Sequence, residues 1–163
     1  MAGVCQEENE SCYTRVAMKI YLDTCCLNRP FDDQSQERIR LETEAVMIIL
    51  ARFGRKEWTW LGSQALEIEI ERAPDVEAQS RLKRIAEFVA QSTKIGQKEL
   101  ERARELESAG FSGFDAVHLA CAENGAANVF LTTDDRLLKS AKRFSKKIHV
   151  KVENPLDWLK EMI

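Results

Sequence analysis

Short apolar runs alternate in this sequence with longer segments in which apolar residues recur at helical spacing. The runs KIYL at Lys19–Leu22 and NVFL at Asn128–Leu131 are typical of buried strands. Strands that alternate with helices predict an α/β fold, in which helices cover both faces of a mainly parallel central sheet. We expect two more strands at Trp58–Leu61 and Ile148–Val152, and helices at Gln34–Arg52, Gln64–Arg72, Val76–Gln91, Gln97–Ser108, Gly113–Asn124, Asp135–Phe144 and Pro155–Met162.

The length of 163 residues fits one domain with a sizeable core. Residues 1–17 are polar and contain three Glu, and Met18 directly precedes the first expected strand. We therefore predict that 1–17 is a polar extension outside the fold and that 18–163 is the folded domain. Because no apolar run approaches the ~20 residues that a membrane-spanning helix needs, no membrane association is expected.

The cysteines predict reduced thiols. The chain has five of them, an odd number without CxxC spacing, and the adjacent pair Cys25 and Cys26 bridges only with strain. A disulfide framework or a structural zinc site is therefore disfavoured, and we expect a cytoplasmic protein.

The net charge of −3 gives no overall signal for nucleic-acid binding. One stretch differs, because Arg136–Lys151 contains seven Lys or Arg and no acid. This stretch has two interpretations: a solvated helix face followed by a polar loop, or a local electropositive patch for polyphosphate. Composition alone does not decide between them.

Acidic residues stand at strand ends and helix starts in four separate parts of the chain. Asp23 directly follows KIYL, Asp134 follows NVFLTT, and Asp115 lies in the first turn of an expected helix. Glu69 lies nearly two turns into the helix that follows the strand WTWL. Parallel sheets bind ligands at the carboxyl ends of their strands, so these four acids are the candidate site.

Each acid also has a purely structural interpretation. Ser112-x-x-Asp115 resembles a capping box, and Asp134 is placed to cap the following helix. Glu69 competes with Glu67 for its role in the segment LEIEIER. The functional interpretation rests on the four acids together, at one edge of one sheet.

Carboxylates that lie close together raise one another's pKa values unless a cation compensates their charge. Oxygen ligands without His–Cys spacing favour Mg²⁺ or Mn²⁺ over zinc. Ions of this kind keep some of their waters and bind substrate phosphate, which suits hydrolysis of a phosphodiester bond. The acids therefore predict a Mg²⁺ or Mn²⁺ site.

The acidic segments resemble, in order, the motifs of the PIN domain family, which includes the nuclease toxins of VapC-type toxin–antitoxin pairs. The resemblance covers Met18 to about Trp158 and rests on the segments MKIYLDT, Ser63 to Glu69, FDAVHLA and LTTD. It implies a three-layer α/β/α fold, divalent-metal-dependent cleavage of RNA, and frequent dimerisation. It also implies a small antitoxin protein as a partner.

The resemblance further assigns roles by motif position. Asp23, Glu69, Asp115 and Asp134 are implied as the catalytic and metal-binding acids. Thr24 and Thr132 match hydroxyl residues that support the acids.

Two segments depart from the family pattern. Asp135 directly follows Asp134, so it supports the fourth acid or takes its place. The segment after Asp23 is longer and more polar than usual, and its Asn28 and Arg29, together with Arg136, are candidates for contacts with substrate. Asn28 and Arg29 have a second interpretation, in which they order the loop. His118 is expected to be packed or hydrogen-bonded rather than a metal ligand.

The sequence thus supports a specific hypothesis: a metal-dependent endoribonuclease that acts as a toxin. In it, Asp23 and Asp115 hold the principal Mg²⁺ or Mn²⁺, while Glu69 and Asp134 complete the shell through waters or a second ion. Two alternatives remain. One is a catalytically silent PIN-like module that binds RNA or protein, and the other is a different Mg²⁺-dependent phosphohydrolase.

Overall fold

Five parallel strands form one sheet in the order β3-β2-β1-β4-β5 in this computed structural model, which describes residues 16–163. The strands are β1 (Lys19–Leu22), β2 (Thr59–Ser63), β3 (Gln91–Thr93), β4 (Val129–Leu131) and β5 (Lys151–Glu153). The helices are α1 (Thr24–Asn28), α2 (Glu37–Gly54), α3 (Gln64–Glu71), α4 (Val76–Ala86), α5 (Gln97–Ala109), α6 (Gly113–Asn124), α7 (Asp135–Arg143) and α8 (Pro155–Met162), with 3₁₀ turns η1 (Arg29–Phe31) and η2 (Ser145–Lys147). The predicted α/β fold with a parallel central sheet is confirmed.

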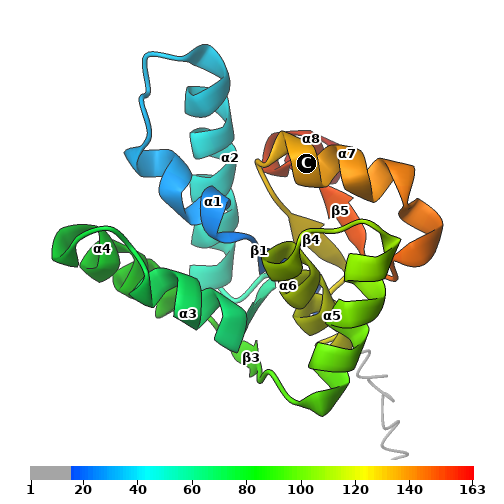
Figure 1. Ribbon diagram of the computed structural model, residues 1–163. Helices are drawn as coiled ribbons and strands as arrows, with labels where there is room; N and C mark the ends of the chain where they lie inside the picture. The colour runs from blue at the N-terminus through cyan, green and yellow to red at the C-terminus, as the bar shows by residue number, and fades with distance from the viewer. Residues whose placement is uncertain (1–15) are drawn as a thin grey trace, which may run out of the picture.

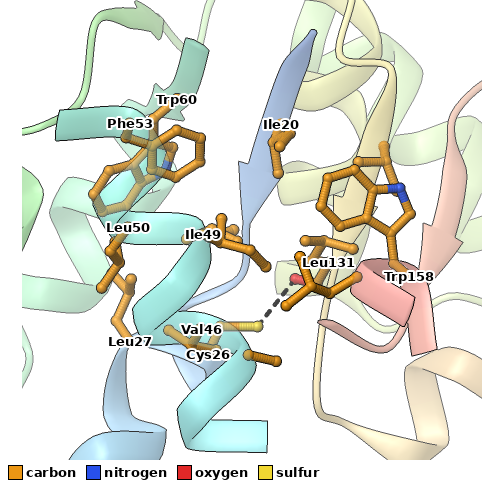
Figure 2. Packing of buried hydrophobic residues seen from close by; sticks show 14 of the residues in the cluster. Ile20, Cys26, Leu27, Val46, Ile49, Leu50, Phe53, Trp60, Leu131 and Trp158 are labelled. Carbon is orange, nitrogen blue, oxygen red and sulfur yellow. Dashed lines mark hydrogen bonds between the residues drawn. The ribbon is translucent and has the colours of Figure 1, made fainter. Parts of the chain in front are cut away.

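The sheet is buried on both faces because its central strands β1, β2 and β4 are mostly apolar. Along β1, Ile20 and Leu22 point to one face and Tyr21 to the other, and all three are fully buried. The face with Ile20 packs against α2 and α8, where Ile49 and Trp158 lie close to it (Figure 2). The opposite face packs against α5, α6 and α7. Three layers result.

The chain reverses its direction of travel across the sheet between β1 and β4. From β1 it proceeds through β2 to β3 at one edge, and then returns to β4 and β5 on the other side. In Figure 1, α1 to α4 lie on one side of the view and α7 and α8 on the other, with β1 and β4 between them. Such a reversal leaves a crevice at the carboxyl ends of the two strands, and Asp23 lies there.

The predicted helix Val76–Gln91 is wrong at its end. The helix α4 ends at Ala86, and residues 91–93 form the edge strand β3 beside β2. The Ala90 N–H donates to the Trp60 carbonyl at 3.0 Å, which starts this pairing. A Cβ at Gly62 would lie 2.8 Å from Val89 Cγ1, so the close approach of the two segments needs a glycine there.

A second difference lies directly after Asp23, where no helix was expected. Residues 24–28 form the short helix α1, and 29–31 form η1. Cys26 anchors α1 to the sheet, because its Sγ donates to the Leu131 carbonyl at 3.3 Å (Figure 2). The segment formed by α1 and η1 is therefore held over the carboxyl ends of β1 and β4.

The predicted polar extension, residues 1–17, lies almost entirely outside the described residues. Within 16–163, no helix combines the length and the apolar character needed to cross a membrane.

Candidate metal centre

Asp23 is the most buried of the four candidate acids. Its side chain is at the end of β1, and the residue is 7% exposed. One carboxylate oxygen accepts the Thr24 N–H at 2.9 Å, and the other accepts the Thr132 hydroxyl at 2.8 Å. Burial raises the pKa of Asp23, and the negative charges of Glu69 and Asp115 add to this effect, while His118 and Thr132 oppose it.

Glu69 reaches the same crevice from α3. Its Oε1 lies 2.8 Å from Nε2 of His118, a residue of α6 that is 1% exposed. Burial alone would raise the pKa of Glu69, but the hydrogen bond from His118, together with the positive charge that this ring carries when it is protonated, outweighs it, and the pKa is lowered. Glu69 is therefore a carboxylate at neutral pH. Glu67, its competitor in the sequence, is exposed and faces Ser92 on β3.

Asp115 lies in the first turn of α6, close to the other acids. The capping-box interpretation does not describe it, because the Ser112 hydroxyl donates to the Asp115 carboxylate at 2.7 Å and caps no backbone N–H. Burial raises the pKa of Asp115, and the charges of Asp134 and Glu69 contribute in the same direction. The four acids therefore face one another closely enough to interact.

Asp134 caps a helix and also interacts with another of the four acids. It caps α7, since one carboxylate oxygen accepts the Arg136 N–H at 2.9 Å, and it also acts electrostatically on Asp115. Its own N–H donates to the Thr132 hydroxyl at 3.1 Å, so Thr132 links Asp134 to Asp23. The cap keeps the Asp134 side chain at the carboxyl end of β4.

The donor atoms of this pocket fit a divalent cation. Asp23, Glu69 and His118 each offer one ligand atom, and these three atoms lie within 4.8 Å of one another. Among the described residues no Lys or Arg forms an ion pair with Asp23, Asp115 or Asp134. Asp23 and Asp115, whose pKa values are raised and which have no cationic ion-pair partner in the described part of the chain, are stabilised as carboxylates by a cation from solution.

The model of the PIN domain family matches residues 20–143, which span all four acids. The chain belongs to the PIN domain family.

Solved structures agree with this PIN fold. FitAcB from Neisseria gonorrhoeae is 16% identical and superimposes with a TM-score of 0.53, over 83% of this chain and 97% of that chain. VapBC2 from Rickettsia felis, solved bound to a DNA fragment from their promoter, is 18% identical with a TM-score of 0.52, over 84% and 98%. At these identities the likeness shows the fold alone. A comparison with curated proteins gives no match.

Two candidate residues of this PIN domain are engaged elsewhere. Asp135 forms a two-fold ion pair with Arg38 of α2, with both N···O distances 2.8 Å, on the exposed side of α7. Arg29 binds Glu42 at 2.6 Å and Asp32 at 3.0 Å. The first interaction joins α7 to α2, and the Arg29–Glu42 pair ties the segment after Asp23 to α2. No contact of Asp135 with the other acids is present in residues 16–163.

A cavity of about 500 Å³ opens beside Glu69, between α1 and α4. Its lining includes Thr24, Asn28, Phe31, Arg72 and Arg81, and the Arg81 guanidinium stacks 4.5 Å over the ring of Phe31. Asn28 therefore lines the cavity beside Glu69. Arg136 is exposed at the start of α7, on the far side of Asp134.

Sequence reasoning missed three side chains that contact the acids or their partners. Tyr21 binds both Ser63 and His118 inside the sheet layer, and Cys25 Sγ lies 3.4 Å from Asp23 and 3.2 Å from the Thr132 hydroxyl. Tyr21 looked like an ordinary core residue of an apolar strand. The only signal was its hydroxyl group, which needs a partner when it is fully buried.

Proposed function

We propose that this PIN domain is a Mg²⁺- or Mn²⁺-dependent endoribonuclease and the toxin of a toxin–antitoxin pair. The observation that carries the proposal is the pocket of Asp23, Glu69, Asp115 and Asp134 at the reversal point of the sheet, without a cationic partner for three of them in residues 16–163. Membership of the PIN family supports a nuclease, which hydrolyses phosphodiester bonds.

In this proposal Asp23 and Asp115 hold the principal ion, and Glu69 and Asp134 complete its surroundings. When bound, a divalent cation supplies positive charge that favours deprotonation of water and offsets the charge that develops on phosphate. The remaining work is done by the chain. Thr132 and the Thr24 N–H orient the Asp23 carboxylate, because together they donate to both of its oxygens.

The surroundings of the pocket support RNA as the substrate. The cavity beside Glu69 offers the Asn28 amide, the half-exposed ring of Phe31 and the cations Arg72 and Arg81, which suit an unpaired nucleotide and its phosphate. On the other side, Arg136 begins the basic stretch that continues along α7. The cavity on one side and the basic stretch on the other could each contact one RNA strand that passes over the four acids.

The toxin role rests on resemblance to VapC-type proteins and on the fold shared with FitAcB and VapBC2. We propose an antitoxin protein as the partner, a homodimer as the assembly and the cytoplasm as the location.

The decisive experiment is cleavage of labelled RNA with Mn²⁺ and with EDTA. We expect Mn²⁺-dependent cleavage that Asp23→Asn lowers about 10³-fold, since removal of a metal ligand forfeits several kcal/mol of charge stabilisation. Glu69→Gln and Glu67→Gln form a matched pair on one helix, and only the former should lose activity.

Two results would contradict the proposal. Cleavage that survives Asp23→Asn would come from a contaminating ribonuclease. Mn²⁺ binding without cleavage of any RNA would instead favour the catalytically silent module.

A further inference from the structure

A buried chain of hydrogen bonds runs from the start of α3 to the Glu69 carboxylate. The Leu66 N–H donates to Ser63 Oγ at 3.1 Å, and Ser63 Oγ lies 2.6 Å from the Tyr21 hydroxyl. The Tyr21 hydroxyl lies 2.5 Å from His118 Nδ1, and His118 Nε2 lies 2.8 Å from Glu69 Oε1. Tyr21, Ser63 and His118 are each at most 1% exposed.

The two ends of this hydrogen-bond chain limit the directions in which its protons can point. At one end the backbone N–H of Leu66 can only donate, so Ser63 Oγ accepts there and its own proton is available for Tyr21. At the other end the Glu69 carboxylate can only accept, so His118 Nε2 carries a proton. The Tyr21 hydroxyl then donates to His118 Nδ1.

The opposite direction is unfavourable. If Tyr21 donated to Ser63, the Ser63 oxygen would accept two bonds, and the acceptor left for its own proton would be the sulfur of Cys121. Sulfur is a weak acceptor, so this direction gives up an oxygen acceptor for a poorer one at a site that is 1% exposed. Placing the His118 proton on Nδ1 would also set the Nε2 lone pair against the Glu69 carboxylate.

We propose that His118 is a positioning residue for Glu69 and not a metal ligand. Tyr21 and Ser63 hold its ring in the tautomer with the proton on Nε2, and this N–H fixes one Glu69 oxygen while the other is left for a cation. The inference rests on the proposed metal site. It also explains why the ring lies within 4.8 Å of the carboxylate atoms although its Nε2 lone pair is occupied by a proton.

The tautomer can be measured without any metal. In protein labelled with ¹⁵N-histidine, two-bond ¹H–¹⁵N spectra distinguish protonated from unprotonated ring nitrogens, and the exposed His149 is an internal reference. We expect His118 to be protonated at Nε2 alone, and Tyr21→Phe to produce a mixture of tautomers. A proton on Nδ1 with a bare Nε2 would overturn the proposal.

The positioning role is tested by Mn²⁺ affinity, measured by titration calorimetry. His118→Leu should weaken binding 10–100-fold, as is typical when a hydrogen-bond partner of a ligand is lost. His118→Gln keeps an N–H donor near the Nε2 position and should stay within about 3-fold of the unchanged protein. Tyr21→Phe leaves the His118 ring in place, and its loss of Mn²⁺ affinity should lie between the losses of the two His118 variants.

Equal losses in His118→Gln and His118→Leu, with both variants folded by circular dichroism, would identify His118 as a ligand and overturn the proposal. A protein that binds no Mn²⁺ at all would defeat the proposed metal site, and the tautomer spectrum would still decide the direction of the hydrogen-bond chain.

Discussion

Two buried carboxylates of this protein, Glu42 and Asp23, have opposite surroundings. Glu42 of α2 is 1% exposed and accepts from Arg29 at 2.6 Å, Arg38 at 2.9 Å and Asn154 at 2.8 Å. Burial alone would raise its pKa, but these donors outweigh it and the pKa is lowered. Asp23 is 7% exposed, has only Thr hydroxyl, thiol and backbone donors in residues 16–163, and its pKa is raised.

The difference separates a structural acid from a candidate metal ligand. The fold supplies its own cations to Glu42, which joins the segment after Asp23 to α2 and to the turn before α8. Around Asp23 the fold supplies hydrogen bonds that orient the carboxylate, but no positive charge that compensates its negative charge. A buried acid that is oriented but not neutralised is poised to bind a cation from solution.

The largest effect on stability is expected at Glu42. Glu42→Gln places an amide among two guanidinium groups and should lower the free energy of unfolding by about 3 kcal/mol, since breaking a buried ion pair strands its partners. Urea denaturation measures this change, and Glu44→Gln, an exposed acid on the same helix, is the control. A loss no greater than the control would remove the contrast with Asp23.

Cation binding should stabilise the acid pocket almost as much. At Mn²⁺ concentrations 100-fold above Kd, linkage predicts about 2.7 kcal/mol, or a rise in Tm of about 5–10 °C. Asp115→Asn should abolish this rise, whereas Asp157→Asn on the exposed surface of α8 should keep it. An equal rise in all three proteins would indicate nonspecific binding.

Replacing a carboxylate by an amide, which is expected to destabilise the protein at Glu42, should stabilise it at Asp23. In EDTA, Asp23→Asn removes an uncompensated buried charge and should raise the free energy of unfolding by about 1 kcal/mol at pH 7. Calorimetry of the metal-free variant measures this. Destabilisation as large as that of Glu42→Gln would mean that Asp23 is a structural acid too.

The smallest effect is a dependence on pH. Because the pKa of Asp115 is raised in the folded state above its ordinary 3.8, its stabilisation is full below that value and is lost as the pH rises through the folded pKa. Asp115→Asn has no such loss, so in EDTA its Tm relative to the unchanged protein should increase by about 1–2 °C from pH 4 to pH 7. A difference that is constant with pH would contradict the raised pKa.

Much of the fold followed from periodicity. The strand Lys19–Leu22 and the helices Gly113–Asn124 and Pro155–Met162 have the predicted bounds, because each carries a strong pattern between clear end signals. The end of the predicted helix Val76–Gln91 could not be read locally. The strand at Gln91 forms only because β2 offers a free edge and Gly62 admits Val89.

The candidate site was predictable for a different reason. Asp23 and Asp134 follow the neighbouring parallel strands β1 and β4, so they share an edge of the sheet whatever the details of packing. What the sequence could not reveal is pairing over long separations. Arg29 was a candidate for binding phosphate, but in the structure it is held by Glu42 of α2. Nothing in the sequence indicated that Tyr21 faces His118.

The helix α6 carries Asp115 and, one turn later, the ring that holds Glu69. Deleting one residue between them would rotate His118 by about 100° about the helix axis and shift it by about 1.5 Å. Such a deletion would uncouple two acids at once without changing either. We therefore expect insertions and deletions in this turn of α6 to be the mutations that disrupt the pocket most.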